Sequence, residues 1–355
     1  MKIPMVNLRP LLAETEPAWR ANLERLFERM HFVLGEQVAA FESELAAAFG
    51  TKHAVAVGSG TAAIELGLRA IGLGDSGAEV LTPALTSPFT AQAILAAGCR
   101  PRFGDVDAEH LLLDPATGIT RRTRAIVPVH LYGQPCDLAP LRRHHLPMVQ
   151  DACQAHGAPV AGPAVAYSFY PTKNLPCLGD GGAVTTDSAR LAARLRSLRD
   201  GGRRNDQVAR ERAINSRLDE MQACYLRAFL PRLAEWNSAR VRLAALYDRV
   251  LAGCAAVTPV ARRTGSVCHL YVIRAERRDR LRRFLADRGI LTGVHYPVPL
   301  HLQPAFRECG QRKGSLPVAE RACRQIVSLP LWPGMPEAQV EEVGQRIREF
   351  YAARR

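Results

Sequence analysis

The stretch that decides the fold is residues 164–175, AVAYSFYPTKNL, which leads into the glycine-rich turn 179–182. Its first half is an apolar run typical of a buried strand, and its second half is a loop that carries Lys173. A lysine at the edge of an α/β sheet becomes a nucleophile when desolvation or a neighbouring cation lowers its pKa to about 7–8. Taken alone, the pattern fits a surface lysine in a glycine-rich turn better.

Upstream of this stretch, residues 58–62, GSGTA, leave a short β-like run and open a helical pattern. Free backbone N–H groups and the positive end of the helix dipole make such a turn an anion site, and glycine lets the backbone approach a phosphate closely. Many strand-to-helix turns have this composition, so the turn by itself indicates phosphate binding only weakly.

Between these two stretches, Asp151 ends an apolar strand pattern that starts at Pro147. Ligands gather at the carboxyl ends of strands in α/β sheets, and a buried carboxylate needs a partner. A protonated pyridine nitrogen is one such partner, because an aspartate there keeps pyridoxal phosphate (PLP) an electron sink. A helix cap or an arginine partner is the alternative for Asp151 taken alone.

The surrounding chain alternates between short apolar runs and helical patterns, which predicts an α/β fold with a mostly parallel central sheet covered by helices. Two helices, 16–30 and 36–49, precede it. The predicted strands are 53–57, 79–82, 101–106, 125–130, 147–151, 164–169 and 182–186, with helices at 62–71 and 89–97.

A smaller C-terminal α+β domain is predicted at residues 241–355, after a large domain at residues 1–240 whose N-terminal segment can pack on the smaller one. Residues 217–251 are helical in pattern, with Pro231 expected to end or kink a helix. Beyond them the patterns predict a strand at 268–275, a helix at 278–288, a strand near 292–296 and a helix at 336–351.

Bulk composition is that of an ordinary globular protein, with 47% hydrophobic and 23% charged residues in 355. The N-terminus lacks a secretory pattern, no apolar run approaches the roughly 20 residues of a membrane span, and we expect a cytoplasmic protein with no membrane partner. The nine cysteines form no pair at metal-ligand spacing, so no metal is expected. The net charge of +13 favours phosphate-bearing ligands, but its arginines lie on helix faces without interleaved aromatics, so no nucleic-acid partner is expected.

The phosphate turn, the acidic strand end and the loop lysine follow one another in this order along the chain. The same order is found in fold-type-I PLP enzymes, which the chain resembles. Over nearly its whole length the chain resembles the DegT/StrS family of PLP-dependent sugar-nucleotide aminotransferases. The matching stretches are 31–35 (HFVLG), 59–62 (SGTA), 130–135 (HLYGQP), 151–157 (DACQAHG), 168–175 (SFYPTKNL), 215–223 (NSRLDEMQA), 295–301 (HYPVPLH) and 328–330 (SLP).

The resemblance implies a role for each matching residue. Lys173 would hold PLP as a Schiff base and carry the proton, and Asp151 would hold the pyridinium nitrogen. The other cofactor contacts implied are Gln154 at the ring 3-hydroxyl, Gly60, Thr61, Ala62 and Ser168 at the phosphate, and Asn215 at the phosphate from the neighbouring subunit of a homodimer with shared active sites. Arg217, His295 and Tyr296 would lie near the sugar nucleotide; an ion pair at a helix end and a core histidine are the alternatives for Arg217 and His295.

The reaction implied is transfer of an amino group from glutamate, with glutamine as the other donor, through pyridoxamine phosphate to a nucleotide-linked keto-sugar. The motifs look most like those of members acting on 3-keto dTDP- or UDP-sugars in amino-sugar biosynthesis. Aminotransfer to a 4-keto-sugar or an aminocyclitol is the closest alternative, followed by a PLP-dependent sugar dehydratase and a non-catalytic regulatory homologue. Dehydratases of the family have histidine in place of the lysine, so Lys173 argues against the dehydratase.

One position departs from the family pattern. Where the family has an aromatic residue that stacks on the PLP ring, this chain has Ser87, two residues before Phe89. We expect either that Phe89 substitutes or that the ring is held less firmly.

Overall fold

Seven strands form the central sheet of the computed structural model, which describes residues 3–203 and 207–352. Parallel bridges Ile126–Met148 and Val129–Asp151 join a three-stranded and a four-stranded unit, so the spatial order is β3-β2-β4-β5-β6-β7-β1. The strands are β1 (His53–Val57), β2 (Glu79–Pro83), β3 (Arg100–Gly104), β4 (Thr123–Ile126), β5 (Val149–Asp151), β6 (Ala164–Ser168) and β7 (Gly182–Thr186). Only β7 runs antiparallel to its neighbours, so the sheet is mostly parallel, as predicted.

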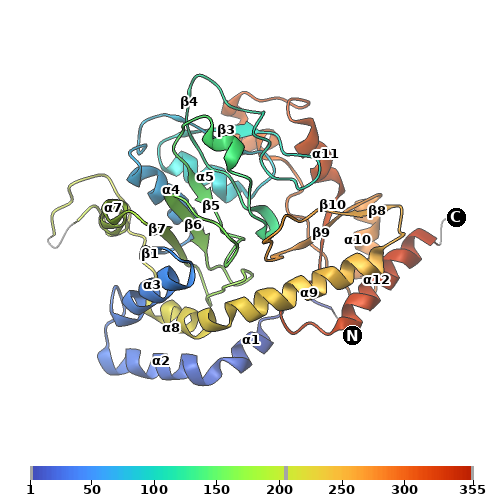
Figure 1. The fold of residues 1–355 in the computed structure, drawn as a ribbon, viewed down its shortest axis with the longest axis horizontal. Helices are drawn as coiled ribbons and strands as arrows, with labels where there is room; N and C mark the ends of the chain where they lie inside the picture. Colours follow the sequence, from blue (N-terminus) through green and yellow to red (C-terminus); the bar gives the residue numbers. More distant parts are fainter. Residues whose placement is uncertain (1–2, 204–206, 353–355) are drawn as a thin grey trace.

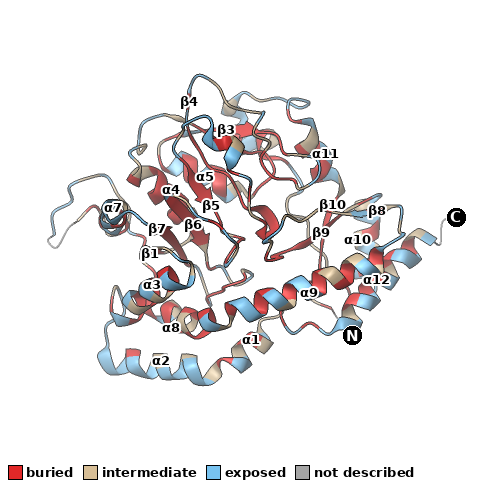
Figure 2. Cartoon of the chain, viewed as in Figure 1, coloured by how far each residue is buried: buried red, intermediate tan, exposed pale blue. Residues whose placement is uncertain are grey.

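Both faces of this sheet are covered by helices (Figure 1). In β1, Ala54 and Ala56 face a core shared with α3 (Glu36–Ala48) and α8 (Glu220–Phe229). Val55 and Val57 face the opposite core, which includes α4 (Gly60–Ala70), α5 (Pro88–Ala96) and α7 (Ala189–Arg199). Burial of alternate residues on both sides explains why β1, β6 and β7 are largely apolar, and Figure 2 shows these strands mostly buried.

A second, three-stranded antiparallel sheet lies toward the C-terminus in the order β10-β9-β8. Its strands are β8 (Val257–Pro259), β9 (Tyr271–Ala275) and β10 (Ile326–Leu329), and it shares a core with α10 (Arg278–Ala286) and α12 (Glu337–Ala352). Ile3, near the start of the chain, belongs to this core and bridges to Ile290.

The long helix α9 (Leu233–Leu251) connects the two units (Figure 1). Its residues Leu233 and Trp236 pack in the core of α3 and α8, whereas Leu243 and Tyr247 pack in the C-terminal core. The division at residues 240 and 241 therefore falls inside a helix that both cores use, and it stays a prediction.

The remaining helices are short or peripheral. They are α1 (Arg9–Glu14), α2 (Glu16–Arg29), α6 (Ala139–Arg142), α11 (Pro317–Gln325) and the 3₁₀ segments η1 (Leu131–Gly133), η2 (Leu230–Arg232), η3 (Leu300–Leu302) and η4 (Pro304–Cys309). Pro231 lies in η2, between α8 and α9, where a helix was expected to break. Across residues 3–203 and 207–352, no helix has the length and apolar character that a bilayer crossing demands.

The strand expected near residues 292–296 is wrong. This segment makes only one isolated bridge, between Gly293 and Ser328. Pro297 and Pro299 follow it, and proline cannot donate a hydrogen bond to a sheet ladder. His295 and Tyr296 instead contact residues of the site described next.

Candidate active site

The turn after β1 forms one wall of the site, at the N-terminus of α4. Ser59 caps this helix by accepting a hydrogen bond from the Ala62 N–H at 3.1 Å. A Cβ on Gly60 would lie 2.5 Å from Ser168 Cβ and 2.8 Å from Cys153 Sγ, so only glycine fits between them. The Ala62 N–H is thus already used, and Gly60 and Thr61 supply the N–H groups that a phosphate at this helix end would take.

Asp151 lies at the carboxyl end of β5 and is 5% exposed. Its Oδ2 accepts a hydrogen bond from the Thr90 hydroxyl at 2.8 Å, and its Oδ1 accepts one from the Cys153 N–H at 3.1 Å. Thr90 in turn contacts the Thr86 hydroxyl at 3.2 Å. These donors hold a buried carboxylate with no arginine or lysine ion pair among the described residues, so one side of its charge is left for a ligand cation.

Lys173 follows β6 in a tight turn in which its N–H donates to the Tyr170 carbonyl at 2.8 Å. Desolvation by the surrounding protein lowers the pKa of the Lys173 amine below its ordinary value, while the nearby Cys153 and Asp151 oppose this shift. Burial raises the pKa of the Cys153 thiol well above its ordinary value, so the thiol is neutral beside the amine. The amine is therefore more available as a nucleophile than a surface lysine.

Gln154 lies three residues beyond Asp151 and is 6% exposed. Its Oε1 accepts from the Tyr132 N–H at 2.8 Å, and its Nε2 donates to the Tyr296 hydroxyl at 3.2 Å. Burial raises the pKa of Tyr296 to about 12, and hydrogen bonds with Ser87 and Gln154 oppose the shift. Tyr296 thus contacts Ser87, the position where the family has an aromatic residue. Phe89, the residue expected to substitute for it, is 65% exposed.

His295 is oriented by the C-terminal sheet. Its Nδ1 lies 2.8 Å from the hydroxyl of Ser328 on β10, and Ser328 is fully buried. Burial, followed by the charge of Lys173, lowers the pKa of His295 to about 4. His295 therefore faces the lysine as a neutral imidazole.

The structure brings these predicted residues together, but it does not bring Asn215 or Arg217 to them. Asn215 is exposed on the surface. Arg217 pairs with Asp200 at the end of α7, at 2.9 Å, which corresponds to the ion-pair alternative. Neither has a described contact with Lys173, Asp151 or Gln154.

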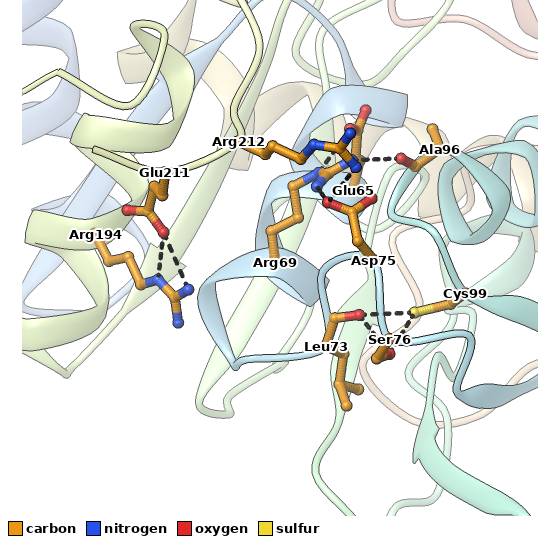
Figure 3. Close-up of polar contacts among 10 residues, drawn as sticks. All are labelled: Glu65, Arg69, Leu73, Asp75, Ser76, Ala96, Cys99, Arg194, Glu211 and Arg212. Carbon is orange, nitrogen blue, oxygen red and sulfur yellow. Dashed lines mark hydrogen bonds and ion pairs between the residues drawn. The ribbon is translucent and has the colours of Figure 1, made fainter. Parts of the chain in front are cut away.

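The segment that precedes Asn215 is fastened to the large unit by the ion pairs drawn in Figure 3. Arg194 on α7 binds Glu211 at 3.1 Å, and Arg212 lies 3.9 Å from Asp75. On the other side of Asn215, the Ser216 hydroxyl accepts from the Gly58 N–H at 3.0 Å. These contacts on either side of Asn215 therefore fix its position on the surface.

Two residues of the site have no signal in the sequence. Thr90 is on α5 and His269 precedes β9, and no spacing relates either of them to Asp151 or Lys173. Both are found only from tertiary contacts, of Thr90 with Asp151 and of His269 with Asn174.

The residues present fit PLP. The α4 N-terminus and Ser168 suit a phosphate, the Asp151 carboxylate suits a pyridinium nitrogen, and the desolvated Lys173 amine suits a carbonyl. When bound, PLP supplies the electron sink that aminotransfer requires.

Comparison with known proteins identifies the family to which the chain belongs. The profile of the DegT/DnrJ/EryC1/StrS aminotransferase family matches residues 15–348. The dTDP-3-amino-3,4,6-trideoxy-alpha-D-glucose transaminase of Streptomyces venezuelae is 43% identical, covering 98% of this chain and 96% of its own. The UDP-N-acetyl-3-dehydro-alpha-D-glucosamine 3-aminotransferase of Acidithiobacillus ferrooxidans is 38% identical, covering 98% and 97%.

A solved structure gives the same result. The crystal structure of S. venezuelae DesV in complex with a ketimine intermediate superposes with a TM-score of 0.95 at 42% identity, covering 100% of this chain and 99% of that one. This chain belongs to the DegT/DnrJ/EryC1/StrS aminotransferase family and is a PLP-dependent aminotransferase.

Proposed function

We propose that this enzyme transfers an amino group from glutamate to a nucleotide-linked keto-sugar, a 3-keto dTDP- or UDP-sugar, in amino-sugar biosynthesis. The observation that carries the proposal is the desolvated Lys173 amine close to Asp151, in a chain of this aminotransferase family. PLP is the cofactor and pyridoxamine phosphate is its amino form between the two half-reactions.

Lys173, Asp151 and Gln154 have the same roles in both half-reactions. Lys173 holds the cofactor and then moves a proton, for which a neutral amine is required. Thr90 and the Cys153 N–H donate to Asp151 and so hold its carboxylate in place for the ring nitrogen. The Gln154 amide donates toward the ring oxygen, with its orientation fixed by Tyr132.

The preference for a 3-keto substrate rests on the two curated relatives, whose names both specify a sugar aminated at carbon 3. The nucleotide and the sugar contacts are expected from His295 and Tyr296, which lie near Lys173 and Gln154. A 4-keto-sugar or an aminocyclitol substrate is an outcome of the test below.

The test is a panel of 3-keto and 4-keto dTDP- and UDP-sugars and a keto-inositol, incubated with glutamate or glutamine and analysed by mass spectrometry for the amine. We expect amination of a 3-keto-sugar with glutamate. Lys173→Ala should lose turnover and the visible absorption of bound PLP. Turnover by Lys173→Ala would refute the role of the lysine, and exclusive amination of a 4-keto-sugar or cyclitol would refute the substrate.

We also propose that the enzyme is a homodimer with shared active sites. Exposed apolar side chains surround the N-terminus of α8, where Val33 bridges to Asp219 and the Leu178 N–H donates to Gln222. The exposed members are Phe32, Val33, Leu178 and Met221, each 39–45% exposed. A patch of this kind on a protein surface favours association, and the exposed Asn215 is then available to the phosphate site of the second subunit.

Mixed dimers test this arrangement. Lys173→Ala and Asn215→Ala chains, each inactive alone, should regain activity when unfolded together and refolded, because one of the two sites then has both residues. A mixture without recovery, although sedimentation shows dimers, would contradict shared sites. Met221→Asp should raise the dimer dissociation constant, whereas Glu337→Lys, at an exposed position on α12 in the C-terminal unit, should leave it unchanged.

The absence of disulfide bonds among the nine cysteines is consistent with a cytoplasmic location. All nine are free, which is usual in reducing compartments, and we propose that the enzyme acts there.

A further inference from the structure

A buried polar cluster lies behind the lysine loop, and the reaction as described above does not use it. It consists of Asn174, His156, Asn237 and His269, which we call the Asn174 cluster. Asn174 follows Lys173 directly, Asn237 is on α9, and His269 leads into β9 of the C-terminal sheet. The cluster therefore joins the lysine loop to both units of the molecule.

The hydrogen bonds fix the orientation of Asn174. Its Nδ2 donates to Asn237 Oδ1 at 2.8 Å and to the Val267 carbonyl at 3.1 Å, so both amide protons are used. Asn237 Nδ2 donates in turn to the His156 carbonyl at 2.8 Å. Asn174 Oδ1 is then an acceptor, and it lies 3.0 Å from His269 Nδ1.

This arrangement also fixes the tautomer of His269. Since Asn174 Oδ1 can only accept, His269 Nδ1 carries the proton and Nε2 carries a lone pair. No hydrogen bond to Nε2 is found among the described residues, although His269 is only 5% exposed. Burial, then the charge of Lys173, lowers the pKa of His269 well below its ordinary value.

We propose that His269 is a positioning residue for Lys173: through its hydrogen bond to Asn174 it holds the loop that carries the lysine. The inference rests on the proposed role of Lys173. The other groups around the amine are Asp151 and Cys153 at the end of β5, His156 from the loop after β5 and His295 from the C-terminal unit. The charge of Arg240 on α9 acts on His156 and His269. Of the histidines among them, His269 is the one bonded to the residue next to Lys173.

A merely structural role would predict loss of stability without any effect on the lysine amine. The discriminating measurement is the pH at which Lys173 becomes half-maximally reactive toward trace acetic anhydride in the full-length, cofactor-free protein. Each lysine is quantified by peptide mass spectrometry. The chain has four lysines, and the exposed Lys52 and Lys313 serve as references within the same sample.

In the wild type, Lys173 should reach half-reactivity at lower pH than Lys52 and Lys313. His269→Leu should raise this pH by about one unit, a tenfold change in the proton equilibrium, because the loop loosens and the amine becomes hydrated. His269→Asn, whose amide nitrogen can replace Nδ1 as the donor to Asn174, should restore most of the wild-type value. His301→Leu, which removes another buried histidine, bonded to Glu320 at 3.1 Å, should lower the melting temperature without moving the half-reactivity of Lys173.

An unchanged half-reactivity of Lys173 in folded His269→Leu, or no recovery in His269→Asn, would overturn the proposal. Should His269→Leu fail to fold, Asn174→Ala removes the same hydrogen bond and is judged by the same criterion. In parallel, bound PLP is fixed by borohydride and mapped by mass spectrometry. Fixation on a lysine other than Lys173 would refute the proposed function, and it is read independently of the labelling result.

Discussion

The side-chain amide of Gln154 donates to the hydroxyl of Tyr296 at 3.2 Å and so connects the large unit to the C-terminal segment 292–301. The orientation of this amide is not free, since its oxygen accepts from the Tyr132 N–H. The Tyr132 hydroxyl completes the connection by donating to the His295 carbonyl at 2.5 Å. The amide therefore presents only N–H protons to whatever binds beside Tyr296.

Gln154→Glu should weaken PLP binding about tenfold and leave the fold intact. The carboxylate can still accept from Tyr132 and Tyr296, but it cannot donate to the ring oxygen, and one lost hydrogen bond costs about 1–1.5 kcal/mol. PLP affinity is measured by fluorescence titration of the cofactor-free protein. Gln150→Glu, at another buried glutamine, is the matched control, and equal PLP affinities for Gln154→Glu and wild type would rule out the assigned contact.

Thr90→Val should lower kcat about tenfold or more, because hydrogen bonds to charged groups contribute about 1.5–3 kcal/mol. The substitution removes the hydroxyl that donates to Asp151 Oδ2 at 2.8 Å and keeps the side-chain shape. It also removes the contact with Thr86. Thr90→Ser retains the hydroxyl and should keep most activity; a Ser variant as slow as the Val variant would mean that packing, and not the donor, is responsible.

Most of the sheet could be predicted from the sequence because each strand carries its own signal. β1 and β7 are found at the predicted residues, 53–57 and 182–186. The strand order and the reversed direction of β7 have no local signal, since they depend on which apolar faces pack together. β8 and β10 were not predicted from the sequence.

The candidate site divides in a similar way. Lys173, Asp151 and Gln154 lie in stretches whose local chemistry and resemblance to a family already indicate a cofactor. Thr90 and His269 contribute through tertiary contacts with Asp151 and Asn174, more than 60 residues away in each case. A single sequence contains no pattern for such contacts, because they arise only when the helices and the second sheet pack.

Arg199→Leu should lower the free energy of unfolding by about 3–5 kcal/mol, the usual cost of breaking a buried ion pair. Arg199 and Glu42 are 7% and 8% exposed and form a salt bridge. Both also bind the backbone of Ala56 on the edge strand β1. Glu42 accepts a hydrogen bond from the Ala56 N–H at 2.9 Å, and Arg199 donates one to the Ala56 carbonyl at 2.7 Å. Arg196→Leu, whose side chain is 44% exposed, should cost less than about 1 kcal/mol. Urea unfolding compares the two, and similar losses would mean that the buried pair is unimportant.

Stability should fall as the pH is lowered from about 6.5 toward 4, because several histidines are buried in their neutral form. Burial lowers the pKa of His130 to about 4 and that of His156 to about 3. Between these values and the ordinary pKa of about 6.5, the unfolded chain binds more protons than the folded chain, so each such histidine costs about 1.4 kcal/mol per pH unit as the pH falls. His130→Gln removes one of these groups and should reduce the slope of unfolding free energy against pH by that amount between pH 6.5 and 5.

The measurement is urea unfolding of cofactor-free protein at constant concentration, since ligand and subunit association also shift stability. His144→Gln, at an exposed position, should leave the slope unchanged, and a wild-type slope in His130→Gln would show that His130 is not the group that titrates.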